Sequence, residues 1–294
     1  MVGRVPESFL DRPVMHFELS DGSTVFRSMG SGSPVLLIHG YPQTHVCWHR
    51  IADGLAGRYE VVAPDLPGYG DSRVALDDDA RFSKRAMAAS LVELMRELGH
   101  ERFAVVGHDR GARVAYRMAL DHPDIVESLT VIDIVPTIEE WEMIDGPASI
   151  DTFHWPFLAQ PGRLPETLIA GAADVWLDHL MASWSTYPDR ISPEAMDEYR
   201  RCFRQRSVID ATCADYRAGA TVDNEHDAAD RNGGHTIGCA VLVLSSDGRG
   251  DLTATWERWA TDVRCEVLDG GHFLPEENPD AVLDALRTHL SSRT

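Results

Sequence analysis

The run Gly107-His108-Asp109-Arg110-Gly111 constrains the fold of this chain more than any other segment. It follows the apolar stretch Phe103–Val106, so a buried strand is expected to end where the run begins. Glycines two positions before and after Asp109 permit a sharp strand-to-helix turn that holds one side chain strained and exposed. Serine is common at such a turn, but an aspartate is ionised at neutral pH and can attack a carbon bearing a leaving group directly. The run therefore predicts an alkyl ester of Asp109 as a reaction intermediate.

Short apolar runs alternate with helix-like patterns over most of the chain, which is typical of a largely parallel sheet flanked by helices. Amphipathic stretches at Phe82–Leu98 and Gly111–Leu120 predict two of these helices. Asp21-Gly22 predicts a hairpin near the N-terminus. The chain is expected to have an α/β fold with strands at Val35–Ile38, Tyr59–Ala63, Phe103–Val106, Leu129–Ile132, Ala240–Leu244 and Val263–Leu268.

The alternation stops between about Thr137 and His235, where the patterns are helix-like and strand-like runs are missing. Four of the seven tryptophans lie in this segment. We expect a helical cap at residues 137–235, inserted into a core domain made of residues 1–136 and 236–294.

The formal net charge of −20 argues against a nucleic-acid partner, and it requires any anionic substrate to meet a locally positive pocket. The segment 1–20 has no apolar signal region, and no stretch of eighteen apolar residues follows, so a cytoplasmic protein without a membrane partner is expected. The odd number and scattered positions of the cysteines predict neither a disulfide framework nor a metal site; they are Cys47, Cys202, Cys213, Cys239 and Cys265.

The segment His39-Gly40-Tyr41-Pro42 follows the expected strand Val35–Ile38, at the sheet edge where open α/β sheets bind ligands. The backbone N–H of Tyr41 is therefore a candidate donor to a developing oxyanion. The second candidate is the backbone N–H of Arg110, the residue after the nucleophile.

His272 follows the last expected strand and a double glycine, where the general base of such a fold should lie. Two acids could orient it. Asp133 directly ends the strand Leu129–Ile132, and Asp247 follows the strand Ala240–Leu244. We favour Asp133 because it ends its strand directly, and Asp247 remains the alternative.

Taken together, these residues resemble the haloacid dehalogenases of the α/β-hydrolase fold, and among them the fluoroacetate dehalogenases. The resemblance is sharpest at residues 107–113, where the family pattern has the nucleophile followed by two arginines. Ala112 stands where that pattern often has a second glycine, which puts only the packing of the helix in question. The resemblance implies no cofactor, a homodimer and these roles: carboxylate binding by Arg110 and Arg113, halide binding by His154, Trp155 and Tyr216, and a triad of Asp109, Asp133 and His272.

The spacing of Arg110 and Arg113 places both on one helix face near the nucleophile, which suits a substrate that brings its own carboxylate. An apolar haloalkane would leave these charges unpaired, unless both arginines pair with acidic side chains of the cap. His154, Trp155 and Tyr216 each offer a hydrogen-bond donor to a departing halide, although aromatic residues of a cap can also be core packing. Trp184 is a weaker candidate for the pocket wall.

The expected reaction is hydrolysis of fluoroacetate or chloroacetate to glycolate and halide. An epoxide hydrolase would need two cap tyrosines, and only Tyr216 has support from the resemblance, although Tyr187 and Tyr199 also lie in the cap. A haloalkane dehalogenase would usually have tryptophan in place of Arg110. A non-catalytic receptor would have no reason to hold Asp109 together with its acid and its histidine.

Overall fold

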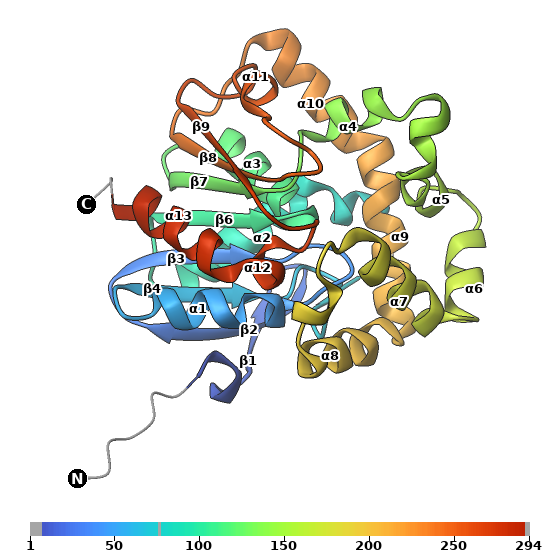
Figure 1. Cartoon of the computed structure of the whole chain (residues 1–294), viewed down its shortest axis with the longest axis horizontal. Helices are drawn as coiled ribbons and strands as arrows, with labels where there is room; N and C mark the ends of the chain where they lie inside the picture. The colour runs from blue at the N-terminus through green and yellow to red at the C-terminus, as the bar shows by residue number, and fades with distance from the viewer. Residues whose placement is uncertain (1–7, 76–77, 292–294) are drawn as a thin grey trace.

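The computed structural model describes residues 8–75 and 78–291. A nine-stranded sheet runs through the molecule in the order β1-β2-β4-β3-β6-β7-β8-β9, with β5 paired to β2 (Figure 1). The pairs from β4 through β9 along this order are parallel, whereas β1, β2 and β5 pair antiparallel. The strands are β1 Met15–Leu19, β2 Gly22–Gly30, β3 Ser33–Ile38, β4 Tyr59–Pro64, β5 Arg73–Val74, β6 Phe103–His108, β7 Val126–Ile132, β8 Ala240–Ser246 and β9 Val263–Leu268.

The six strands expected from apolar runs are all present, which confirms the predicted α/β fold class. The central strand β6 is buried along its whole length and β3 is buried over residues 35–38, because helices cover both faces of the sheet. The hairpin prediction was one residue off. Gly22 pairs with Leu19 inside the β1–β2 ladder, so the two-residue turn is Ser20-Asp21.

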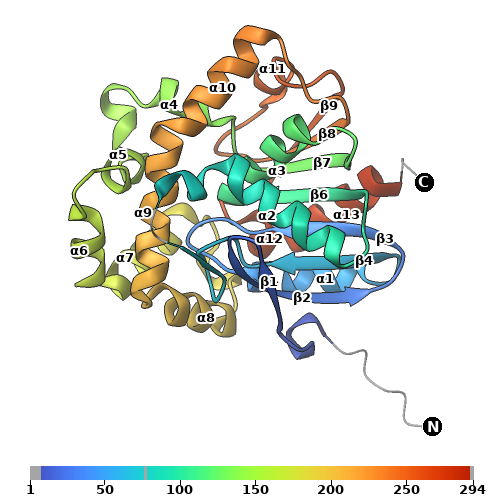
Figure 2. The same ribbon diagram turned by 180° about the vertical axis from the view of Figure 1, so that it is seen from behind.

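Helices pack on both faces of the sheet, as Figures 1 and 2 show from opposite sides. Helices α2 (Lys84–Glu97) and α3 (Arg110–Asp121) cover one face, and α1 (His49–Leu55) and α13 (Pro279–Ser291) cover the other. The short helices α11 (Thr253–Trp256) and α12 (Leu274–Glu277) flank β9 in sequence.

Seven further α-helices lie between β7 and β8 along the chain, and all fall inside the segment 137–235 that the sequence assigns to a cap. They gather beyond the carboxyl ends of the central strands (Figure 1). The domain bounds themselves stay a prediction, and residues 1–7, 76–77 and 292–294 of the core domain lie outside the described residues. The cap helices are α4 Thr137–Met143, α5 His154–Leu158, α6 Leu164–Ala170, α7 Ala173–Trp184, α8 Pro193–Phe203, α9 Arg206–Ala220 and α10 Val222–Gly233.

Among residues 8–75 and 78–291 the longest helix is α9, with 15 residues. In the part of the chain that the structure describes, no helix has both the length and the apolar character that crossing a membrane requires. The cytoplasmic location stays a prediction.

The turn from β6 into α3 is the sharp turn that the sequence predicts, and it depends on close backbone approach. Asp109 has a φ of 48°, in the left-handed region that side chains rarely adopt. A Cβ added to Gly111 would lie 2.2 Å from the carbonyl oxygen of His39, and one added to Gly107 would lie 2.5 Å from Cα of Ala112. Both positions therefore require glycine, because any side chain would push β3 or α3 away from the turn.

Gly111→Ala is expected to destabilise the protein by about 1–3 kcal/mol or more, since the added methyl group meets fixed backbone of the neighbouring strand. Gly238→Ala is the matched control, because a Cβ there has no described atom within 4 Å. Denaturant unfolding of both variants measures the difference. Equal stability would show that the turn can relax without cost.

Candidate active site

Asp109 lies at the carboxyl end of β6 and is held from the side of the neighbouring strand β3. The backbone N–H of Tyr41 donates a hydrogen bond of 2.7 Å to Oδ1 of Asp109. A Cβ on Gly40 would lie 2.4 Å from Cβ of Asp109, so glycine lets the turn approach this closely. Burial alone would raise the pKa of Asp109, but its neighbours, His272 foremost, hold it well below its ordinary value. Asp109 is therefore an ionised carboxylate in a largely dry site.

His272 lies between two carboxylates. Its Nδ1 is 2.7 Å from Oδ2 of Asp133, and its Nε2 is 3.7 Å from Oδ2 of Asp109. The other oxygen of Asp133 accepts a 2.8 Å hydrogen bond from the backbone N–H of Ser246, which fixes the orientation of the acid. Burial works to lower the pKa of His272, yet the two carboxylates outweigh it and raise the pKa to about 9.

The alternative acid, Asp247, lies in the loop after β8 and also lines the cavity at this site. Its backbone N–H donates to the carbonyl oxygen of Leu268, which places it at the end of β9. The carboxylate bonded to Nδ1 of His272 is that of Asp133, the acid that the sequence favoured.

Both arginines after the nucleophile are already paired with carboxylates of the cap. Arg110 donates from Nε and Nη2 to the two oxygens of Asp215, at 2.9 and 2.7 Å. Arg113 donates to Oε2 of Glu140 at 3.2 Å and to the carbonyl oxygen of Val135 at 2.8 Å. The expectation that an uncharged substrate would leave these charges unpaired was therefore wrong, and the alternative of cap partners holds.

The pairing nevertheless leaves part of each guanidinium unused. Nη1 of Arg110 and Nε of Arg113 are buried and have no hydrogen-bond partner among residues 8–75 and 78–291. Buried donors without partners are costly, and such costs are usually met by a ligand or an ordered water. Each guanidinium therefore has one buried nitrogen whose hydrogen-bonding capacity the described residues do not use.

Sequence reasoning missed the group that holds Arg110. Asp215 also accepts from the hydroxyl of Tyr69 at 2.6 Å and from Nζ of Lys84 in a very close contact. Lys84 lies 3.4 Å from Asp223 as well, so the ammonium is shared between two cap carboxylates. Lys84 is the only lysine of the chain and is buried, which is unusual for this residue type. The presence of a single lysine in the sequence was the one signal that could have pointed to this cluster.

The three aromatic candidates of the cap lie together beside the arginines. His154 and Trp155 begin α5, and both ring centroids are within 6 Å of the ring of Tyr216 on α9, at 5.8 and 5.5 Å. The guanidinium of Arg110 lies 4.1 Å from the Tyr216 ring centroid, and that of Arg113 lies 4.5 Å from the Trp155 ring centroid. The aromatic faces therefore stabilise the buried cations as well as shaping the site.

Two of these side chains have protonation states set by burial. Burial lowers the pKa of His154 to about 3 and raises the pKa of Tyr216 well above its ordinary value. Nδ1 of His154 has no hydrogen-bond partner within the described residues. At neutral pH the site therefore offers a neutral imidazole and a protonated phenol.

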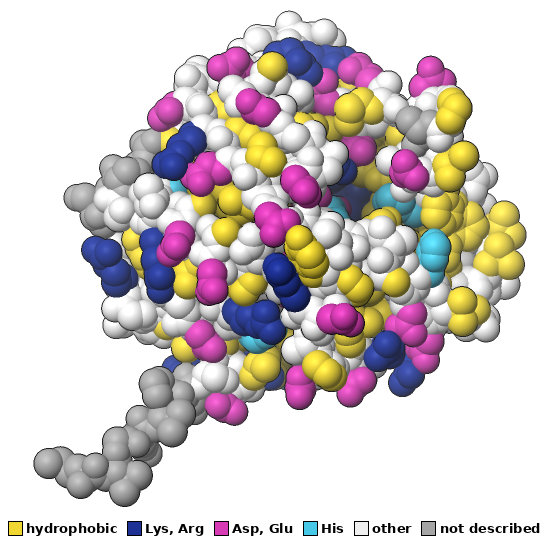
Figure 3. Space-filling model, viewed as in Figure 1, with side chains coloured by type: hydrophobic (Ala, Val, Ile, Leu, Met, Phe, Trp, Pro, Cys, Tyr) yellow, Lys and Arg dark blue, Asp and Glu magenta, His cyan; other side chains and the backbone are white. Residues whose placement is uncertain are grey.

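A cavity of about 530 Å³ opens onto these side chains between the core and the cap. Asp109, His272, Arg113, His154 and Trp155 line it, and Arg110 and Tyr216 both lie next to the lining residue Trp155. Trp184, the weaker candidate, is a wall residue, and its ring centroid lies 4.6 Å from that of His154. The face shown in Figure 3 is hollowed, with histidine side chains inside the hollow.

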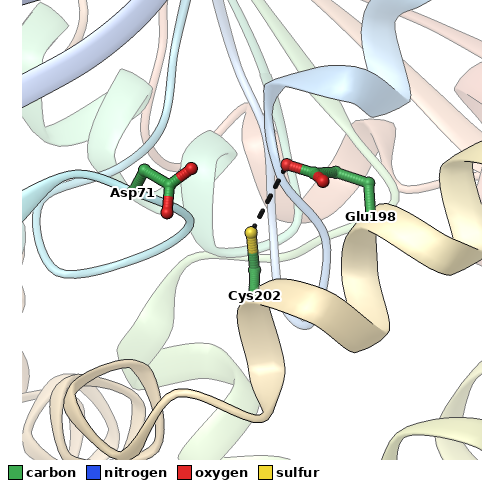
Figure 4. Close-up of side chains that lie close together, drawn as sticks. All are labelled: Asp71, Glu198 and Cys202. Carbon is green, nitrogen blue, oxygen red and sulfur yellow. Dashed lines mark hydrogen bonds between the residues drawn. The ribbon is translucent and has the colours of Figure 1, made fainter.

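Asp71, Glu198 and Cys202 form the one grouping of metal-ligand type found in the described chain (Figure 4). Arg201 lies among them, donating to Asp71 at 2.5 Å and to Glu198 at 2.7 Å. Burial raises the pKa of the Cys202 thiol well above its ordinary value, so the sulfur is protonated and donates to Glu198 at 3.5 Å. A guanidinium already neutralises the carboxylates, and a neutral thiol is a poor ligand, so these residues do not fit a metal ion.

Comparisons with known proteins agree with this architecture. Residues 33–279 match the family model described as the alpha/beta hydrolase fold. A fluoroacetate dehalogenase of Burkholderia sp. is 42% identical over 270 residues, which cover 89% of this chain and 88% of that protein. A soluble epoxide hydrolase of Corynebacterium sp. (strain C12) is 31% identical over 262 residues, covering 87% and 89%.

A crystal structure from Nostoc sp. PCC 7120, described as that of an α/β hydrolase, superposes with a TM-score of 0.93. Its sequence is 45% identical, and the match covers 96% of this chain and 99% of that one. The family match spans most of the chain and includes Asp109, Asp133 and His272. The protein is a hydrolase that belongs to the α/β-hydrolase fold family.

Proposed function

We propose that the protein hydrolyses the carbon–halogen bond of a small 2-haloacid, such as fluoroacetate or chloroacetate, to a 2-hydroxyacid and halide. The proposal rests above all on three buried nitrogens without described partners, Nη1 of Arg110, Nε of Arg113 and Nδ1 of His154, beside a carboxylate nucleophile. Both the carboxylate of the substrate and the departing halide need hydrogen-bond donors. The similarity to a fluoroacetate dehalogenase also supports it.

In the first step a carboxylate oxygen of Asp109 attacks the α-carbon, the carbon–halogen bond breaks, and the halide leaves with the bonding electrons. Arg110 and Arg113 hold the substrate carboxylate. Their pairing with Asp215 and Glu140 fixes the two guanidiniums before the substrate arrives, so little ordering remains to be done on binding. A fixed carboxylate sets the α-carbon in line with the nucleophile.

The departing halide is solvated by His154, Trp155 and Tyr216. Tyr216 keeps its proton because burial raises its pKa, so its hydroxyl remains a donor. His154 is neutral at pH 7 and carries one N–H. Fluoride is a strong acceptor and a poor leaving group, so these donors stabilise the transition state most for a fluorinated substrate.

Formation of the ester also prepares the base for the second step. While Asp109 is ionised, its charge helps to keep His272 protonated. Esterification removes that charge, the pKa of His272 falls, and the imidazole can take a proton from water. The resulting hydroxide attacks the ester carbonyl of Asp109, with the N–H groups of Tyr41 and Arg110 stabilising the oxyanion. The 2-hydroxyacid leaves and Asp109 is regenerated.

Epoxide hydrolysis is the competing function, because the Corynebacterium relative carries that name. It would use a second tyrosine beside Tyr216 to donate to the epoxide oxygen. The hydroxyl of Tyr187 donates to Asp269 at 2.8 Å, and that of Tyr199 donates to Glu276 at 3.0 Å. With both cap tyrosines engaged elsewhere, the haloacid is favoured.

A haloalkane dehalogenase is disfavoured because Arg110 stands where such an enzyme usually has tryptophan. Unpaired charges on Arg110 and Arg113 do not count against a haloalkane, because both arginines have carboxylate partners in the cap. A non-catalytic receptor is disfavoured by the 2.7 Å contact of His272 with Asp133 and by the strained backbone of Asp109, because ligand binding alone requires neither.

Halide release from fluoroacetate, chloroacetate and a haloalkane, together with diol formation from styrene oxide, tests the proposal. We expect turnover of the two haloacids and little with the uncharged compounds, because only the acids engage the arginine donors. Asp109→Ala supplies the background rate. Diol formation from styrene oxide without halide release from the acids would replace the proposal with epoxide hydrolysis.

His272→Asn should leave the displacement intact and stop ester hydrolysis, because the base acts only in the second step. Intact mass spectrometry after incubation with fluoroacetate should then show Asp109 carrying a carboxymethyl group. The matched control is His235→Asn, an exposed histidine outside the site, which should turn over without trapping. An inert His272→Asn protein with no gain in mass would mean that His272 already acts in the first step.

Tyr216→Phe removes one donor to the leaving halide, and it should slow defluorination more than dechlorination. A lost donor of this kind costs about 3 kcal/mol, so a selectivity change of about tenfold or more is expected. Tyr187→Phe removes a hydroxyl that donates outside the cavity and is the control. Equal losses for fluoroacetate and chloroacetate would assign the cap aromatics to packing alone.

A further inference from the structure

Glu277 ends helix α12, five residues after His272, and its side chain is completely buried. Its carboxylate accepts hydrogen bonds from backbone N–H groups of two separate segments. Oε2 accepts from Thr186 at 2.8 Å, Tyr187 at 2.7 Å and Gly271 at 3.1 Å, and Oε1 accepts from Phe273 at 3.0 Å. A buried carboxylate that collects four N–H donors is a strong structural anchor.

The two segments are the loop that carries His272 and the cap segment 184–187 that follows helix α7. Gly271 and Phe273 flank His272 on either side, so Glu277 holds the backbone before and after the base. The N–H of His272 itself donates to the carbonyl oxygen of Trp184 at 2.8 Å, in the same cap segment. The base is therefore fixed against the cap through its backbone, while Asp133 of the core holds its ring.

The contact between the two segments is close enough to require glycine at position 271. A Cβ there would lie 2.4 Å from the backbone nitrogen of Thr186 and 2.6 Å from the carbonyl oxygen of Trp184. The ring of Trp184 also lies near both the base and the candidate halide site. Its centroid is 5.5 Å from that of His272 and 4.6 Å from that of His154. A shift of the cap segment would therefore move the base and the wall of the halide site together.

We propose that Glu277 is a positioning residue that fastens the His272 loop to the cap, so that the imidazole is placed to activate water for hydrolysis of the Asp109 ester. The inference rests on the proposed function for the identity of the ester. Glu277 acts through the backbone, since its bonds go to main-chain donors on either side of the base. Its loss should therefore affect the second step, which needs the base, more than the first.

The test is Glu277→Gln, which keeps the size of the side chain but replaces one acceptor oxygen with an N–H₂ group that faces donors. Displacements of catalytic groups by about 1 Å can cost a hundredfold in rate, so ester hydrolysis should slow about tenfold or more. The halide burst from fluoroacetate should persist, and mass spectrometry should find the carboxymethyl ester accumulated. The amount of trapped ester is divided by the amount of halide released in the burst. Because unfolded molecules contribute to neither amount, partial unfolding does not change this ratio.

Glu276→Gln is the matched control, one residue away and equally buried. Glu276 bonds Tyr199 and Gln43, and burial raises its pKa to about 8, so a neutral amide closely imitates its state at pH 7. This variant should hydrolyse the ester as the unmodified protein does. If the Glu277→Gln variant releases halide over many turnovers and accumulates no ester, the proposal is overturned.

A second measurement does not depend on turnover. The ring protons of His272, followed by NMR against pH, should titrate near the raised value in the unmodified protein and in Glu276→Gln. They should titrate closer to the ordinary histidine value in Glu277→Gln, because a displaced loop separates the imidazole from Asp109. An unchanged titration overturns the positioning role. Absence of activity in the unmodified protein with a shifted titration in the variant would instead overturn only the proposed function.

Discussion

The placement of one imidazole between two buried carboxylates is the constraint that the rest of the structure has to satisfy. Asp109 follows β6, Asp133 follows β7, and His272 follows β9, so the three side chains meet only if the parallel strands are in register. Burying such charges costs several kcal/mol per ion unless they pair with good geometry. The raised pKa of His272 means that this pairing favours the folded state below the ordinary histidine pKa and that the contribution is lost as pH rises toward 9.

The buried arginines also need partners that compensate their charge, and the cap supplies these partners. Arg110 and Arg113 lie in the first turn of a helix that is buried along most of its length, and both side chains are buried. Asp215 and Glu140 neutralise them from the cap side, and aromatic rings cover their faces. Buried cations can therefore exist inside a protein with a net charge of −20, because specific carboxylates and aromatic faces hold them.

Most of the sheet could be predicted from the sequence because buried parallel strands are nearly continuous apolar runs, and the turn at Asp109 could be predicted because its glycines obey a local steric rule. The partners of the arginines could not. Asp215 lies 105 positions after Arg110, and nothing in the spacing of cap acids indicates which of them turns inward. The role of Glu277 could not be predicted either, because its hydrogen-bond donors are backbone N–H groups, which every residue except proline has.

The relatives carry names of two activities, and the chemistry explains why one scaffold supports both. Fluoroacetate and an epoxide each present a carbon that a carboxylate can attack, and each reaction ends with hydrolysis of the same kind of ester. A triad such as Asp109, Asp133 and His272 would serve either reaction, so it carries no information about the substrate. The difference lies in what the first step must stabilise, an alkoxide in one case and a halide beside a carboxylate in the other. Under the proposed function, Tyr216, the two guanidiniums and the neutral imidazole of His154 supply the donors for the halide and the carboxylate, so that specificity is set there rather than in the triad.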